Sequence, residues 1–91
     1  MPYQPARAIQ HRVTAVVASI LAGNDIQRSF TPDERLADIG LTSIDMVNLM
    51  LGVEAEFNIT IPQQEIVPEH FTSVATIEKL VADILRGVAR S

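Results

Sequence analysis

Cysteine is absent from the sequence, and its absence excludes three kinds of chemistry. Without a thiol the chain has no disulfide bond, no thiolate metal ligand and no cysteine nucleophile. Long apolar runs are also absent, because no stretch approaches the roughly 20 apolar residues of a membrane-spanning helix. Residues 1–12 lack the apolar centre of a signal peptide. We therefore expect a soluble cytoplasmic protein with no membrane span.

Basic residues are missing from the centre of the chain. Residues 36–78 contain no lysine or arginine, within a chain whose formal net charge is −4. An acidic segment repels nucleic acid and anionic membrane and attracts basic protein surfaces, so no nucleic-acid partner is expected. The charge alone fits a solvated acidic face with no partner equally well. The carboxylates of this segment are Asp38, Asp45, Glu54, Glu56, Glu65, Glu69 and Glu78.

Apolar residues recur at three- and four-residue steps in three stretches, which indicates amphipathic helices. We expect these helices from near Pro5 to about residue 22, over 43–57, and from 74 to 86 or slightly beyond. Gly23 suits a left-handed stop after the first helix. The apolar stripe of the first helix is Ile9, Val13, Val16, Val17 and Ile20, and that of the last is Val74, Ile77, Val81, Ile84 and Val88, with Leu80 and Leu85 beside it.

The segment before the last helix has room for only one more, short helix. Pro62 and Pro68 bracket residues 63–67, which limits any helix there to one or two turns of low stability. No run of alternating residues finds a partner strand. The sequence therefore predicts an all-α fold with three principal helices and one minor helix, in a single domain spanning residues 1–91 and acting as a monomer.

A long connection over residues 24–41 joins the first two helices. Its apolar residues Phe30, Leu36 and Ile39 can attach it to the core, and residues 31–34 have the composition of a short helical turn. Connections of this length in small domains are often functional.

Ser43 stands where this connection gives way to the second helix. Thr42 and Asp45 match a capping box, with Thr42 as the N-cap. On this interpretation Ser43 is an ordinary first-turn residue with no special role.

The second helix carries two apolar stripes, although one is enough to join a small core. Ile44, Val47 and Leu51 form the second stripe, which begins beside Ser43 and is bordered by Asp45 and Glu54. An exposed apolar stripe with an acidic border is typical of a docking surface. The alternative is that this stripe is also buried, against the long connection and the short helix. The core stripe is Met46, Leu49, Met50, Val53 and Phe57.

Residues 36–62, LADIGLTSIDMVNLMLGVEAEFNITIP, resemble the central segment of the acyl carrier and peptidyl carrier protein family. That family typically shows Leu-Gly, then Asp-Ser-Leu, then an acidic and apolar helix that ends in Glu-Glu-Phe and Ile-Pro. The corresponding places here hold Ile39-Gly40, Thr42-Ser43-Ile44, Glu54-Ala55-Glu56-Phe57 and Ile61-Pro62.

The resemblance implies a four-helix bundle of acyl-carrier type and a role for Ser43. A phosphopantetheinyl transferase would attach 4′-phosphopantetheine from coenzyme A to Ser43, and the cofactor thiol would carry an acyl or aminoacyl group as a thioester. A loading ligase or synthase and downstream transferases would be the other partners, in fatty acid biosynthesis or secondary metabolism. The residues expected to contact these partners are Thr42, Ile44, Asp45, Val47, Asn48, Leu51 and Glu54.

The sequence departs from the family pattern at three positions. Thr42 replaces the usual aspartate before the serine, which removes a charge beside the hydroxyl and bears on which transferase loads the chain. Asn48 and Ala55 stand where carboxylates are common in fatty-acid carriers. The second helix and the segment after it resemble those of specialised stand-alone carriers, including aminoacyl carriers.

Two other function classes compete with a carrier. An enzyme is not expected, because His11 and His70 are not placed beside Ser43 and no G-x-S-x-G elbow surrounds that serine. The acids of residues 25–38 lack the spacing of a calcium loop, so no metal site is expected. The serious rival is a helical protein–protein interaction module with a carrier-like shape that is never modified.

Overall fold

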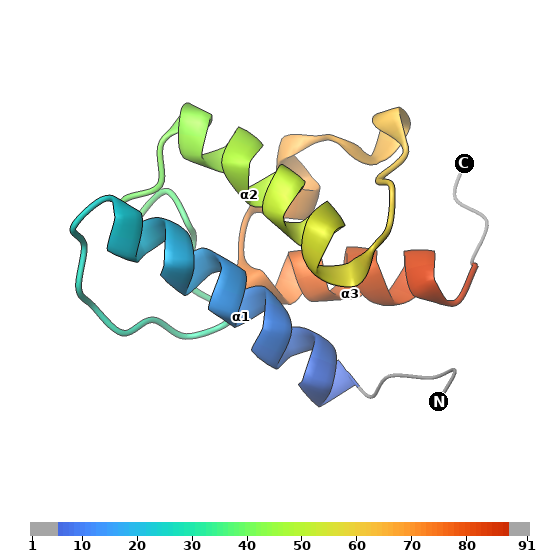
Figure 1. Cartoon of the computed structure of the whole chain (residues 1–91), viewed down its shortest axis with the longest axis horizontal. Coiled ribbons are helices and arrows are strands. Elements are labelled where there is room, and N and C mark those ends of the chain that lie inside the picture. Colours follow the sequence, from blue (N-terminus) through green and yellow to red (C-terminus); the bar gives the residue numbers. More distant parts are fainter. Residues whose placement is uncertain (1–5, 88–91) are drawn as a thin grey trace.

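The computed structural model describes residues 6–87, and within this range the regular secondary structure is all helical, with no strand. Three α-helices, α1 (Ala6–Gly23), α2 (Ser43–Phe57) and α3 (Val74–Leu85), are joined by the long connection and by a segment with two 3₁₀ turns, η1 (Gln63–Glu65) and η2 (Pro68–Phe71) (Figure 1). The all-α prediction with three principal helices is confirmed. The predicted helix start at Pro5 and the stripe residue Val88 lie outside the described residues.

The core is built from one face of each helix, and α1 packs against both α2 and α3. Most stripe residues predicted from the sequence are buried, whereas Val16, Ile20, Met46, Met50 and Ile84 are half-buried at its edge. The buried apolar residues are Ile9, Val13, Val17, Leu21, Leu36, Ile39, Leu41, Leu49, Val53, Phe57, Ile61, Phe71, Val74, Ile77, Leu80 and Val81.

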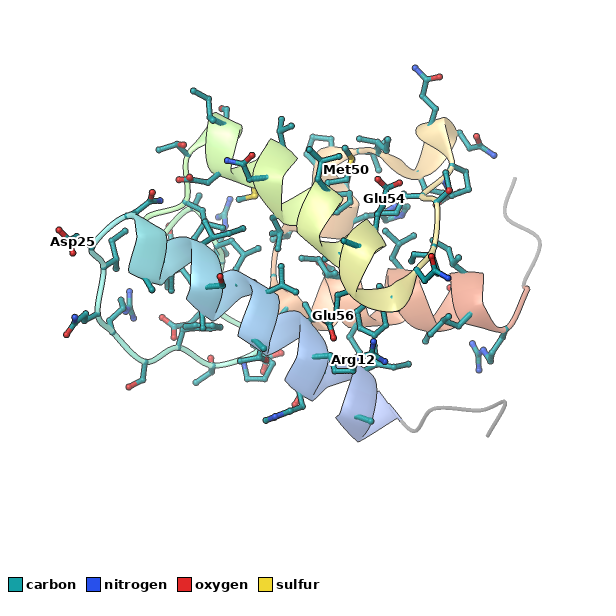
Figure 2. All side chains as sticks on the ribbon, viewed as in Figure 1. Arg12, Asp25, Met50, Glu54 and Glu56 are labelled. Atoms are coloured by element: carbon teal, nitrogen blue, oxygen red, sulfur yellow. The ribbon has the colours of Figure 1, made fainter. Side chains whose placement is uncertain are left out.

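The helices α1 and α2 approach closely near Gly52. A Cβ atom at Gly52 would lie 2.9 Å from Cγ1 of Val16, so the absence of a side chain permits this approach. Farther along the same interface, Arg12 Nε lies 2.8 Å from Oε2 of Glu56, and Figure 2 shows the two side chains together. The Arg12 guanidinium also lies 4.3 Å from the centre of the Phe57 ring, a cation–π contact.

The stop predicted at Gly23 is wrong. Gly23 is the last residue of α1, and the left-handed residue is Asp25, with φ of 64°. Ile26 N–H donates to the Leu21 carbonyl at 2.8 Å and Asp25 N–H donates to the Ala22 carbonyl at 3.1 Å, which is a Schellman motif. Ile26 packs against the core, so tertiary packing rather than the glycine determines where the helix ends.

The connection is tied to the beginning of α3 as well as to the core. Phe30 is half-buried and Leu36 and Ile39 are buried, as predicted. Leu36 N–H donates to the Thr72 carbonyl at 2.8 Å, and Ala75 N–H donates to the Pro32 carbonyl at 3.0 Å. The segment 31–34 forms a single turn and not a helix, with the Glu34 carboxylate accepting from Thr31 N–H at 2.8 Å.

The short third helix takes the form of the 3₁₀ turn η1, and a second 3₁₀ turn, η2, follows it. Glu65 N–H donates to the Pro62 carbonyl at 2.9 Å and Ile66 N–H donates to the Gln63 carbonyl at 3.1 Å. The proline ring at Pro68 prevents a helix from continuing beyond residue 67 but is favourable as the first residue of η2. Phe71 at the end of η2 is buried in the core.

Candidate functional site

The beginning of α2 is organised by a capping box between Thr42 and Asp45. Oγ1 of Thr42 accepts from Asp45 N–H at 3.3 Å, and Oδ2 of Asp45 accepts from Thr42 N–H at 2.8 Å and from the Thr42 hydroxyl at 3.0 Å. The chain reaches this position through Gly40, whose φ of 112° disfavours any residue with a Cβ atom. The predicted N-cap at Thr42 is confirmed.

The Asp45 carboxylate serves the fold, and the residue as a whole is only 8% exposed. The backbone N–H of Thr42 contributes most to lowering the pKa of Asp45, followed by a hydrogen bond from the side chain of Asn24, while burial acts in the opposite direction. Asp45 therefore joins the end of α1 to the start of α2 as a buried anion. The prediction that Asp45 belongs to an exposed docking face is wrong, because its carboxylate is directed into this cap.

Ser43 is the first residue of α2 and is exposed. The cap is made by the side chain of Thr42, so the Ser43 hydroxyl has no structural task and no hydrogen-bond partner among residues 8–87. Unpaired backbone N–H groups and the positive end of the helix dipole lie at the same place. A hydroxyl with these surroundings can form a phosphodiester, whose negative charge is favourable at a helix N-terminus.

A groove of about 520 Å³ begins beside Ser43 and runs between α2 and the segment with the two 3₁₀ turns. Met50, labelled in Figure 2, lies on the side of α2 that faces this segment. Most of the lining is apolar, and Arg35 is its one charged residue. The lining residues are Arg35, Ala37, Ser43, Met46, Val47, Met50, Ile66, Val67, Pro68, Phe71 and Thr72.

The second apolar stripe of α2 is exposed, with 74% of Ile44, 55% of Val47 and 52% of Leu51 accessible. The alternative that it is buried against the connection is therefore wrong. Asn48 and Thr42 are exposed beside it. We call Ile44, Val47, Asn48 and Leu51 the α2 ridge. Ile66, which sequence reasoning did not assign to this region, is 43% exposed and lines the groove.

The acidic border expected along the ridge is not free. Glu54 is half-buried, and its Oε2 accepts from Ile61 N–H at 2.8 Å, an interaction that ties the end of α2 to the next segment. Together with the burial of Asp45, this contact leaves the ridge apolar and nearly uncharged. Glu54 was predicted to contact partners through an exposed carboxylate. In the structure this carboxylate is half-buried and hydrogen-bonded within the chain.

The histidines lie away from Ser43. His11 is exposed on α1, and Nδ1 of His70 lies 2.8 Å from the Glu65 carbonyl oxygen and 3.3 Å from its Oε1. Neither histidine lines the groove. Within residues 6–87 no three acidic or histidine side chains gather as metal ligands would, and no helix has the length and hydropathy needed to cross a membrane.

Comparison with known proteins gives consistent results. The model of the family described as "Phosphopantetheine attachment site" matches residues 11–84. Aminoacyl carrier protein 1 of Bradyrhizobium diazoefficiens is 55% identical over 73 residues, which cover 80% of this chain and 81% of that protein. Aminoacyl carrier protein 2 of the same organism is 49% identical over 77 residues, which cover 85% of this chain and 86% of that protein.

A solved structure shows the same fold. It is a chain in the crystal structure of Bradyrhizobium japonicum glycine:[carrier protein] ligase complexed with glycylated carrier protein. The match has a TM-score of 0.75 and 49% identity, and it covers 80% of this chain and 97% of that chain.

Proposed function

This chain belongs to the family that bears the phosphopantetheine attachment site, and we propose that Ser43 is the residue to which the group is attached. The chain is a carrier protein with a covalent 4′-phosphopantetheine. The observation that carries the proposal is the exposed Ser43 hydroxyl at the first position of α2, where the neighbouring Thr42 makes the cap. When bound, the group supplies a thiol that holds the cargo as a thioester.

The residues around Ser43 have separate tasks in this proposal. Thr42 and Asp45 fix the first turn of α2, so the Ser43 hydroxyl keeps one position without being used as a cap. The first-turn N–H groups favour the negative phosphodiester. The fold positions these groups, and the partner enzymes perform the chemistry, so the chain is not itself an enzyme.

The relatives support an amino acid as the cargo. Two are named aminoacyl carrier proteins, and the similar solved chain comes from a complex of a glycine:[carrier protein] ligase with glycylated carrier protein. We infer that a ligase of this type loads this chain with an amino acid after a phosphopantetheinyl transferase has modified it, and that downstream transferases receive the cargo. We expect the modification, the loading and the transfer of the cargo to occur in the cytoplasm, with the carrier as a monomer.

The α2 ridge is the surface on which these enzymes would dock. Its three apolar side chains are more than half exposed, and they begin one residue after Ser43. An enzyme bound there would have the modified serine at the border of its interface. The exposed side chain of Thr42 lies at the same border.

Intact mass measurement tests the attachment proposal. The apo chain is incubated with coenzyme A and a broad-specificity transferase, and the wild type is expected to gain the mass of one phosphopantetheine. Ser43→Ala should gain none, whereas Ser19→Ala, which changes an exposed serine on α1, should behave as the wild type. A wild type that never gains the group would favour the unmodified interaction module instead.

The cargo proposal has its own test. The holo chain is incubated with ATP, a glycine:[carrier protein] ligase and each of several amino acids, and the mass of the loaded chain identifies the cargo. An aminoacyl adduct that hydroxylamine removes is expected, because thioesters react with this nucleophile. Loading by fatty acyl ligases alone would contradict an aminoacyl carrier while leaving the attachment site intact.

A further inference from the structure

Arg35 lines the groove and makes no ion pair with the side chains that the structure describes. It is exposed, it lines the same groove as Ser43, and no ion pair or side-chain hydrogen bond involves it within residues 8–87. Arg12, Arg28 and Arg86 are by contrast paired, with Glu56, Glu34 and Asp83 respectively. A free guanidinium in a groove with no carboxylate in its lining is available for an anion.

The backbone around Arg35 is fixed by neighbouring contacts. Its carbonyl accepts from Asp38 N–H at 2.9 Å. The next residue, Leu36, is buried, donates to the Thr72 carbonyl at 2.8 Å and accepts from Leu41 N–H at 3.1 Å. This turn brings Arg35 to the same groove as the start of α2, although eight positions separate it from Ser43. Its exposed side chain makes no hydrogen bond within residues 8–87.

The polar groups of the groove are concentrated in three side chains. Arg35, Ser43 and Thr72 are polar or charged, whereas the other lining residues are all apolar. A phosphopantetheine arm has the same division, because its phosphate is anionic and much of the remaining arm is uncharged. The one cation of the lining therefore matches the one charge of the group that Ser43 would hold.

We propose that Arg35 is a positioning residue that pairs with the phosphodiester on Ser43 and holds the first part of the arm at the groove. The proposal rests on Ser43 as the attachment site. A planar guanidinium can donate two parallel hydrogen bonds to phosphate oxygens, which an ammonium group cannot do. The pair is exposed, so it restrains the arm without immobilising it, and the thiol end remains free to reach an enzyme.

The experiment compares four holo chains: wild type, Arg35→Gln, Arg35→Lys and Lys79→Gln. Lys79 is the matched control because it is an exposed cation on α3, makes no ion pair within residues 8–87 and does not line the groove. Each chain is loaded from coenzyme A that is ¹³C-labelled in the geminal methyl groups near the phosphate. The readouts are the ³¹P chemical shift of the phosphodiester and the relaxation of the labelled methyl carbons. A melting curve for each variant checks that the fold is unchanged.

Arg35→Gln should move the ³¹P signal and make the methyl groups more mobile, with about a twofold loss of the restrained population, which is the size expected of an exposed ion pair. Arg35→Lys should be intermediate, and Lys79→Gln should match the wild type. In about 0.5 M NaCl, which screens exposed charges, the wild type should approach Arg35→Gln.

Two outcomes would overturn the proposal, and they can be told apart. If Arg35→Gln and Lys79→Gln give the same ³¹P and methyl signals as the wild type, Arg35 does not pair with the phosphate and the attachment proposal stands. If the wild type gains no phosphopantetheine at all, both proposals fail.

Discussion

Thr42 and Asp45 hold each other through three hydrogen bonds, of 2.8, 3.0 and 3.3 Å. The residue before Ser43 and the residue two positions after it therefore form one rigid unit. Ser43 lies between them and takes no part in it. A serine at the start of a helix is usually read as a cap, and here the cap belongs to its neighbour.

The first prediction concerns stability at this helix end. Thr42→Ala should lower the free energy of unfolding by about 1 kcal/mol, because it leaves a first-turn N–H without its side-chain acceptor. Ser43→Ala should change it by no more than about 0.5 kcal/mol, because an exposed residue is replaced by a better helix former. Urea unfolding of both variants measures the difference. A larger loss in Ser43→Ala than in Thr42→Ala would assign the cap to the serine.

The second prediction concerns pH. Because hydrogen bonds lower the pKa of Asp45 below its ordinary value of 3.8, the folded chain holds the proton less tightly than the unfolded chain does. The contribution of Asp45 to the free energy of unfolding is therefore fully present above the ordinary pKa. It is lost as the pH falls through the lowered pKa of Asp45 in the folded chain. Urea unfolding of the wild type and Asp45→Asn should show a constant difference from pH 7 to pH 5 and a shrinking one below about pH 4. A difference that grows on acidification would contradict this sign.

The third prediction concerns docking on the α2 ridge. Leu51→Ala should reduce kcat/KM for loading by a cognate ligase about fivefold, since it removes roughly 1 kcal/mol of apolar contact at the interface. Glu54→Gln should have a smaller effect, because the amide oxygen of the new side chain can still accept from Ile61 N–H as the carboxylate does. Loading should also depend weakly on salt, because the ridge carries no free carboxylate.

Leu85→Ala is the matched control, since Leu85 is an exposed leucine on α3. It should load as the wild type does. If loading survives Leu51→Ala but is abolished by Glu54→Gln, the prediction that Leu51 matters more than Glu54 is wrong.

The fourth prediction concerns the mobility of residues 63–67. The backbone hydrogen bonds there belong to one 3₁₀ turn and its flanks, and Ile66 is partly exposed. Short 3₁₀ turns open more readily than long packed helices. Hydrogen exchange by NMR should give protection factors at least about tenfold lower than in the buried turns of α2. Equal protection in the two segments would show that this wall of the groove is as rigid as the helix.

The bounds predicted for 43–57 agree with α2 because the signals that set them are local. A threonine cap, an aspartate three residues later and a left-handed Asn58 at the other end all lie within a few residues of the helix. The end of α1 could not be predicted in the same way. It depends on how Ile26 packs against the core, and this contact overrides the stop signal at Gly23.

At the site, too, the features set by neighbouring residues could be predicted, whereas those set by distant contacts could not. The second stripe could be found from its spacing, and so could the serine beside it. The capping box also predicts the bond between the Asp45 carboxylate and Thr42 N–H. The further hydrogen bond from the side chain of Asn24 could not be predicted, because Asn24 lies in another segment. The place of Arg35 depends on a hydrogen bond between Leu36 and Thr72, residues far apart in the sequence. No local pattern contains such a contact.

The two hydrogen bonds that join the connection to the start of α3 give the groove unequal sides. Pro32 and Leu36 are anchored by them, whereas the opposite side is formed by two short 3₁₀ turns. Phe71 at the end of this side is buried in the core, so widening of the groove would displace residues 63–68 and leave Ser43 and Arg35 in a fixed frame. Groups of different size that enter the groove would therefore all start beside Ser43 and extend along the same fixed side.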